Sequence, residues 1–114
     1  MTIKDWPLDE RPREKLLAKG AEALSDAELL AILLRSGYAK QTAVDLARQL
    51  LAACGGVADL RQARYQDFSR IKGLGISHFV AVQAGIALAN RALPSPIKKR
   101  HAVDNIAATR AFLL

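Results

Sequence analysis

The turn at residues 71–77, Ile-Lys-Gly-Leu-Gly-Ile-Ser, constrains the fold more than any other part of this chain. It places a Gly-hydrophobic-Gly sequence between two helix-compatible segments, which is the outline of a helix-hairpin-helix. Gly73 can adopt a positive φ, Leu74 can insert between the helices, and Gly75 leaves backbone N–H groups uncovered at the start of the next helix. Because a helix N-terminus attracts anions, the turn predicts a site for a nucleic-acid phosphate, bound without reading of the bases.

Capping and breaking residues predict helices on both sides of this turn. Ser25 and Glu28 form a capping box before an apolar helix that should end near residues 35–37. That helix is apolar on nearly every face, so we expect it at the centre of the core. No segment alternates with a period of two, and we predict an all-α fold. Four further regions are expected to be helical: residues 8–20 with Pro12 at the first helical position, Gln41 or Thr42 to Ala53 ended by Gly55 and Gly56, one or two short helices at 57–61 and 65–70, and residues 78–92 with Ser77 as N-cap. Leu60, Tyr65 and Phe68 are expected to anchor the core.

A weaker version of the glycine-turn pattern lies upstream, in residues 30–43. An apolar segment leads into a loop that contains Arg35, Gly37 and Lys40, and a second apolar segment follows. We interpret this as a degenerate second hairpin. Two hairpins related by a pseudo-two-fold axis would bring their turns to one side and contact both strands of a duplex. An αα-hairpin with a longer loop fits these residues at least as well.

One residue departs from the usual hairpin pattern. The fourth residue after the second glycine is normally small, so that the two helices can approach, but here it is Phe79. Either the register of the hairpin differs or the hairpin opens to accommodate the ring.

The charge of the chain permits a phosphate-rich partner without requiring one. The 114 residues are enough for one domain and carry a net charge of +6, with a pI near 9.9. Residues 1–93 and 94–114 each contribute +3, so half of the excess lies beyond Pro94. We predict a helical domain of residues 1–93. Residues 94–114 would then be a linker, with Lys98, Lys99 and Arg100, and the start of a truncated following domain.

The residues give no support to catalytic or metal chemistry. His78 and His101 are isolated, Cys54 is the one cysteine, and no serine has a nucleophile elbow or a base near it. The glycine pair lacks the third glycine of a dinucleotide fingerprint. We therefore expect no enzyme activity in this part of the chain, no metal and no cofactor. With no signal pattern and no apolar run long enough to cross a membrane, we expect a cytoplasmic protein without membrane contact.

Three blocks of the sequence resemble a known family. Residues 11–17 (Arg-Pro-Arg-Glu-Lys-Leu-Leu), residues 24–37 from Leu-Ser-Asp-Ala-Glu to Arg-Ser-Gly, and the turn at 71–75 look like the amino-terminal domain of the bacterial RadC family. The resemblance extends to about residue 92. It implies a small helical domain related to the tandem hairpin domain of the Holliday-junction protein RuvA. It also implies a longer parent that continues into a JAB/MPN metalloprotease-like domain with a His-x-His and Asp zinc site. The chain contains no His-x-His, so no metal or catalytic residue can be carried over.

The sequence and the resemblance together predict a non-enzymatic module that binds DNA independently of sequence and acts in repair or recombination. The alternative is a protein-interaction domain that docks a downstream JAB/MPN domain or another subunit, in which the glycines have only a structural role. The residues expected to contact DNA are Lys72, Gly73, Gly75, Ser77, His78, Arg35, Gly37 and Lys40.

Overall fold

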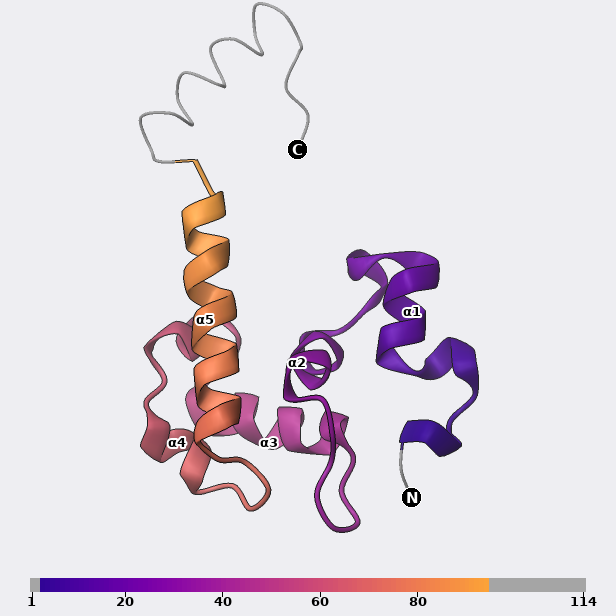
Figure 1. Cartoon of the computed structure of the whole chain (residues 1–114), viewed down its shortest axis with the longest axis horizontal. Coiled ribbons are helices and arrows are strands. Elements are labelled where there is room, and N and C mark those ends of the chain that lie inside the picture. The colour runs from indigo at the N-terminus through magenta and orange to yellow at the C-terminus, as the bar shows by residue number, and fades with distance from the viewer. Residues whose placement is uncertain (1–2, 95–114) are drawn as a thin grey trace, which may run out of the picture. The chain divides into compact units, whose positions relative to one another are not determined.

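The computed structural model describes residues 3–94, which are helical with no β-strand among them, so the predicted all-α class is confirmed (Figure 1). The only sheet-like pairing in this range is an isolated bridge between Tyr38 and Gln41. The five α-helices are α1 (Pro12–Lys19), α2 (Asp26–Leu34), α3 (Ala43–Cys54), α4 (Tyr65–Ser69) and α5 (Ile76–Ala92), and the four 3₁₀ helices are η1 (Ile3–Asp5), η2 (Leu8–Glu10), η3 (Ala21–Ala23) and η4 (Ala58–Gln62).

The chain divides into two units, Met1–Ala84 and Gly85–Leu114. All contacts and pockets considered below lie within the first unit. The predicted domain boundary at residues 93 and 94 falls at the end of the described range. The basic cluster Lys98–Arg100 and the expected start of a following domain lie outside that range.

Helix α1 begins and ends where the sequence predicts. Pro12 occupies its first turn, where a missing N–H costs nothing, and Gly20 follows its last residue with a φ of +86°. The N–H of Gly20 donates to the carbonyl of Leu16, which closes the last turn. Residues 8–10 form the separate short helix η2 and do not join α1.

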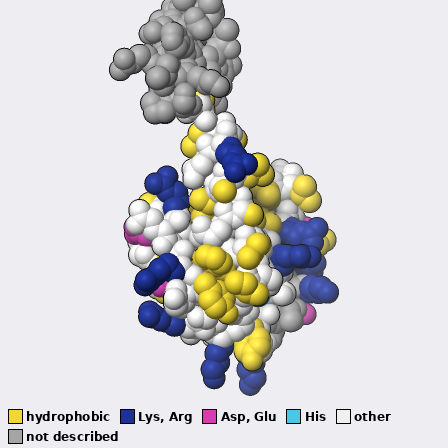
Figure 2. Space-filling view, turned by 60° about the vertical axis from the view of Figure 1, so that its left-hand side comes forward, with side chains coloured by type: hydrophobic (Ala, Val, Ile, Leu, Met, Phe, Trp, Pro, Cys, Tyr) yellow, Lys and Arg dark blue, Asp and Glu magenta, His cyan; other side chains and the backbone are white. Residues whose placement is uncertain are grey.

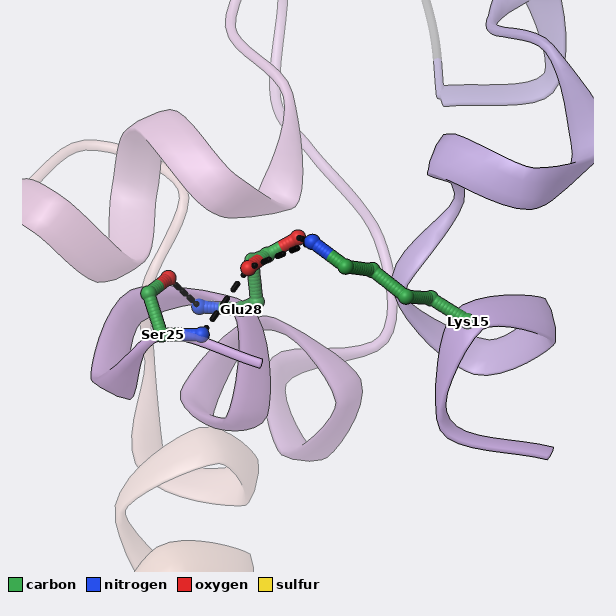
Figure 3. A network of polar contacts seen from close by, with 3 residues as sticks. All are labelled: Lys15, Ser25 and Glu28. Carbon is green, nitrogen blue, oxygen red and sulfur yellow. Dashed lines mark hydrogen bonds and ion pairs between the residues drawn. The ribbon is translucent and has the colours of Figure 1, made fainter. Parts of the chain in front are cut away.

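Helix α2 starts at the predicted capping box (Figure 3). The N–H of Glu28 donates to Oγ of Ser25 at 3.1 Å, and the N–H of Ser25 donates to Oε1 of Glu28 at 2.9 Å. Nζ of Lys15, on α1, lies 3.1 Å from Oε2 of Glu28. One carboxylate therefore caps α2 and also joins it to α1, a connection that the sequence pattern did not reveal.

The burial of α2 corrects one prediction. Ala27, Leu30, Ala31 and Leu34 are buried, but Leu33 is 42 % exposed and Leu29 is also exposed. The helix is therefore buried along one stripe and not on nearly every face, because its neighbours α1 and α3 cover only part of its circumference.

Helix α3 supplies the largest block of buried side chains. Thr42 and Asp45 form a second capping box, with the N–H of Asp45 donating to Oγ1 of Thr42 at 3.1 Å. At the other end, the N–H groups of Gly55 and Gly56 both donate to the carbonyl of Leu51, and Gly55 has a φ of +101°. The side chains between these ends that are almost fully buried are Ala43, Val44, Leu46, Ala47 and Leu50.

Phe79, the residue that departs from the usual hairpin pattern, packs in an aromatic cluster. The ring of Phe79 meets Phe68 edge-to-face with centroids 5.3 Å apart, and meets Tyr65 at 6.1 Å. Phe68 is fully buried and Leu60 is buried, as predicted, but Tyr65 is 42 % exposed and the prediction that it anchors the core is wrong. Tyr65 instead contacts the ring of Phe79 from a partly exposed position.

Helix α5 begins at Ile76, one residue before the predicted N-cap Ser77. The N–H of Gly75 donates to Nδ1 of His78 at 3.0 Å, so the backbone donor of the residue that precedes the helix has an acceptor. Ser77 therefore lies in the first turn. Further along, Val82 is fully buried, and the side-chain amide of Gln83 donates to the carbonyl of Leu60.

We predict that Glu28→Gln removes part of the acid sensitivity of the fold. The N–H of Ser25 lowers the pKa of Glu28 below its ordinary value of 4.5, and Lys15 acts in the same direction against the effect of burial. A carboxyl group with a lowered pKa in the folded state stabilises the protein above about pH 4.5, and this contribution is lost as the pH falls through the folded pKa. Glutamine retains the capping acceptor but carries no charge.

Urea unfolding at pH 7 and at pH 3 checks this prediction. Wild type should have a larger free energy of unfolding than Glu28→Gln at pH 7, and this difference should be smaller at pH 3. The difference between wild type and Lys15→Met should also be smaller at pH 3, because Lys15→Met removes the other partner of the ion pair. A difference that does not depend on pH would contradict the role of the carboxylate.

Candidate nucleic-acid interface

The two glycine-containing loops lie side by side. The α2–α3 loop and the α4–α5 loop extend at the same end of the first unit (Figure 1). A Cβ atom added to Gly73 would lie 2.4 Å from Cβ of Tyr38 and 2.8 Å from its Cγ. The backbone of one loop therefore rests directly against a side chain of the other, and only glycine allows so close an approach.

The α2–α3 loop contains two unusual backbone conformations. Arg35 has a φ of +79° and a ψ of −48°, and the N–H of Ser36 donates to the carbonyl of Leu34 at 3.0 Å. This is the positive-φ form of the γ-turn, which is rare and strained for a residue with a side chain. Ala39 has a φ of +56° at the first central position of a two-residue hairpin closed by Tyr38 and Gln41.

Gly37 is held by close packing. A Cβ atom there would lie 2.0 Å from the carbonyl oxygen of Gln41 and 2.9 Å from Cα of Thr42. The small hairpin therefore needs glycine at this position for geometric reasons. Lys40, the second central residue of the hairpin, is exposed.

The two glycines of the α4–α5 loop have different roles. Gly73 has a φ of +97° and faces Tyr38, so the fold requires it. Gly75 has no positive φ, and no atom lies within 4 Å of the place where its Cβ would be. Nothing in the packing of the described residues demands glycine at position 75, and its small size leaves the start of α5 open to solvent.

Fewer backbone N–H groups of this loop are unpaired than the sequence predicts. The N–H of Leu74 donates to the carbonyl of Ile71, and the N–H of Gly75 donates to His78. Within residues 3–94 the N–H groups of Ile76, Ser77 and His78 have no protein acceptor. They are the usual unpaired donors of a first helical turn.

The first turn of α5 contains no acidic residue, whereas each of the other four α-helices has at least one. Glu28, Asp45 and Asp67 each accept the N–H of the residue three positions earlier, before α2, α3 and α4. In α5 the corresponding acceptor is the imidazole of His78. The positive end of this helix dipole is therefore not neutralised by a carboxylate.

A groove of about 760 Å³ lies between the end of α2, with the first residues of the α2–α3 loop, and the first turns of α5. Arg35, Ser77 and His78, which the sequence predicted as site residues, line it together, and Gly37 lines a smaller neighbouring pocket that shares Arg35. Lys40, Lys72, Gly73 and Gly75 line neither, and the two lysines are exposed beside them. The remaining lining residues of the groove are Arg13, Ile32, Leu33, Leu34, Ser36 and Ala81.

Sequence reasoning missed two residues of this region. Arg13, on α1, reaches the groove only because α1 packs beside α2, and no local pattern marks it. Tyr38 lies against Gly73, and an aromatic residue between Gly37 and Lys40 was a signal that could have been used.

Positive charge exceeds negative charge in the part of the chain that contains the two loops. Residues 29–84 contain seven Lys and Arg against three Asp, whereas residues 1–28 contain five against seven Asp and Glu. Of the three acids, Asp45 and Asp67 are engaged at helix starts. Figure 2 shows Lys and Arg side chains at the end of the molecule where these loops lie, with hydrophobic side chains beside them.

Residues 3–94 give little support for a reactive thiol or a metal site. Burial and the nearby Asp67 and Asp59 raise the pKa of the Cys54 thiol, which makes it a weaker nucleophile. Residues 3–94 contain no group of three or more His, Cys, Asp or Glu side chains placed to hold a metal ion. No helix in the same range has the length and hydrophobicity needed to cross a bilayer.

Comparison with known proteins gives one family, both by its sequence profile and by individual relatives. Residues 3–80 match the sequence profile of the family described as UPF0758 N-terminal. A UPF0758 protein of Thioalkalivibrio sulfidiphilus is 51 % identical over 99 % of this chain and 51 % of its own length. Those of Saccharophagus degradans and Nitrosococcus oceani are 48 % and 46 % identical, over 99 % and 100 % of this chain and 50 % and 51 % of their own lengths.

The chain spans about half the length of the curated relatives it matches. Their names state no activity. No solved structure matches the chain.

We predict that Gly73→Ala destabilises the fold and that Gly75→Ala does not. At position 73 a methyl group meets Tyr38 in a positive-φ backbone, and the expected loss is about 2 kcal/mol or more of unfolding free energy. At position 75 the methyl group enters open space, and the expected change is within about 0.5 kcal/mol. Urea unfolding followed by circular dichroism measures both. The double variant Gly73→Ala, Tyr38→Gly should recover the steric part of the loss, because alanine at position 38 would keep the Cβ atom that lies 2.4 Å from the added methyl group. Simple additivity of the two changes would contradict the contact.

We also predict that Arg35→Gly is more stable than Arg35→Ala. Both remove the guanidinium group, but only glycine relieves the positive φ, so the two should differ by about 1 kcal/mol or more. The same comparison of thermal or urea unfolding at position 48, an exposed position inside α3, should have the opposite sign, because glycine weakens a helix. Equal stability of the two Arg35 variants would show that the turn relaxes without strain.

Proposed function

The chain belongs to the UPF0758 family, and we propose that this domain binds DNA without reading its sequence, by contacts to backbone phosphates at the start of α5 and along the α2–α3 loop. The RadC-type motifs that suggested a hairpin protein from the sequence lie in the matched segment.

The observation that carries the proposal is the unneutralised start of α5 beside two arginines. Three N–H groups point out of the first turn, no acid lies there, and Arg13 and Arg35 line the groove that contains Ser77 and His78. A phosphate oxygen accepts hydrogen bonds both from such N–H groups and from guanidinium groups. The site is open and extended, as contact with a polymer requires.

The strain at Arg35 is a second support. A γ-turn of this kind would form most easily with glycine, yet the chain places an arginine there, with its side chain at the groove. Residues held in unfavourable conformations cluster at functional sites. The guanidinium group of Arg35 is the reason we propose for retaining the strain.

The donors in this region favour phosphate over base recognition. Backbone N–H groups and exposed lysines such as Lys40 and Lys72 bind phosphates of any sequence. We therefore propose a non-enzymatic module, with a role in DNA repair or recombination suggested by resemblance to the RadC family. A DNA partner implies a cytoplasmic protein.

We predict that duplex binding weakens steeply with salt and depends on Lys72. Fluorescence anisotropy of a labelled 20-base-pair duplex over 50–300 mM salt should give a linear fall of log K with log salt, and Lys72→Glu should reduce that slope by about 1 as well as weaken binding. Lys19→Glu is the matched control, because it makes the same charge change in the last turn of α1. It should retain the wild-type slope.

Absence of duplex binding at 50 mM salt would overturn this proposal and favour the docking alternative. One feature supports that alternative: Ile76 and Val80, one turn apart on α5, are 60 % and 56 % exposed. Under it, the apolar face would contact a JAB/MPN domain, which the RadC resemblance implies in longer relatives, or a second subunit. Sedimentation of this chain alone and with such a domain would then show association that Val80→Glu abolishes.

A further inference from the structure

We propose that Tyr38 is a stacking platform for an unpaired base, so that the domain binds DNA with unpaired bases more tightly than fully paired duplex. This inference rests on the proposed function and narrows its ligand. It assigns Tyr38 a part in recognition beyond the backbone contacts of the neighbouring lysines and N–H groups.

The position of Tyr38 is fixed from one side and open on the other. The base of its side chain lies against Gly73, where an added Cβ would be 2.4, 2.8 and 3.3 Å from Cβ, Cγ and Cδ2. The residue is nevertheless 51 % exposed. The aromatic contacts within residues 3–94 join Tyr65, Phe68 and Phe79 and do not include Tyr38. Its ring is therefore anchored without being covered by another ring.

The loop around Tyr38 is arranged to hold it in place. The N–H of Tyr38 donates to the carbonyl of Gln41 at 3.0 Å, and the N–H of Gln41 donates back at 2.9 Å. Gly37 packs on the same carbonyl, and Ala39 has the positive φ that the two-residue turn needs. A tyrosine has few rotatable bonds, so a side chain held at its backbone and at Gly73 loses little further entropy when a base stacks on it.

The charges beside the ring complete the argument. Lys40 is two residues from Tyr38 in the same turn, and Lys72 precedes Gly73 in the facing loop; both are exposed. Sites for single-stranded nucleic acid combine cations that follow the backbone with aromatic rings that stack on bases. A paired duplex buries the faces of its bases, whereas a gap or bulge exposes them. The partner that fits all three side chains is a backbone with an unpaired base beside it.

The experiment compares two labelled DNAs that differ only in pairing. One is a 20-base-pair duplex, and the other is the same duplex with three unpaired adenines in a central bulge. Anisotropy at one salt concentration gives both dissociation constants. Wild type should bind the bulged DNA at least about fivefold more tightly. Tyr38→Phe should retain this preference, and Tyr38→Leu should lose it, so that the Tyr38→Leu variant binds the two DNAs with equal affinity.

Two controls distinguish a loss of stacking from a loss of folding. Tyr65→Leu changes the other tyrosine of the chain, which is 42 % exposed but packs on Phe79, and should leave the preference unchanged. With wild-type protein, 2-aminopurine in place of the central bulged adenine should lose fluorescence on binding, because stacking on a ring quenches it.

The outcomes separate this inference from the proposed function. Equal affinity of wild type for the two DNAs, a Tyr38→Leu variant that keeps the preference, or an increase in 2-aminopurine fluorescence overturns the role of Tyr38 while duplex binding stands. Loss of binding to both DNAs in wild type overturns the proposed function itself.

Discussion

The burial of one face of α3 is the constraint on which the other described elements of the first unit depend. Five side chains of this helix are almost completely removed from water, and α2, η4 and α4 each pack against it. Apolar burial of this extent is the main source of stability in so small a domain. Because α2 and α4 both contact α3, the loops that leave and enter these helices are carried to the same end of the unit. The candidate site is therefore a consequence of how the core packs.

The polar side chains at the helix starts determine which helix dipoles are neutralised by a carboxylate. Glu28, Asp45 and Asp67 accept backbone N–H groups near their own helices, so each of these acids sits at the positive end of a helix dipole. At α5 the imidazole of His78 takes the equivalent place. The same capping geometry thus stabilises four helix starts but neutralises the dipole at three of them. This difference, and not the net charge, is the reason we propose an anion site at the start of α5.

Backbone strain is concentrated in the α2–α3 loop, where both described residues with a side chain and a positive φ lie. Arg35, Ala39 and Gly73 all have positive φ, and Gly73 also receives Tyr38 at a distance that excludes any side chain. Elsewhere the helix ends use glycine at such angles, as at Gly20 and Gly55, for ordinary termination. Arginine in a strained turn and a half-exposed tyrosine on a glycine do not improve the core. The proposed binding of a phosphate backbone, with an unpaired base beside it, would account for both features.

The sequence by itself determined the local elements, because the interactions that start and end a helix join residues three or four positions apart. Pro12, the Ser25 and Glu28 box, and Gly55 with Gly56 were predicted in their correct roles. It also identified Arg35, Ser77 and His78 as candidates. Only the tertiary structure decided that Leu33 and Tyr65 face solvent, that Phe79 fits between two rings, and that Arg13 and Tyr38 join the candidate site. Burial and proximity between distant residues depend on which faces pack together, and no local pattern in a single chain encodes that choice.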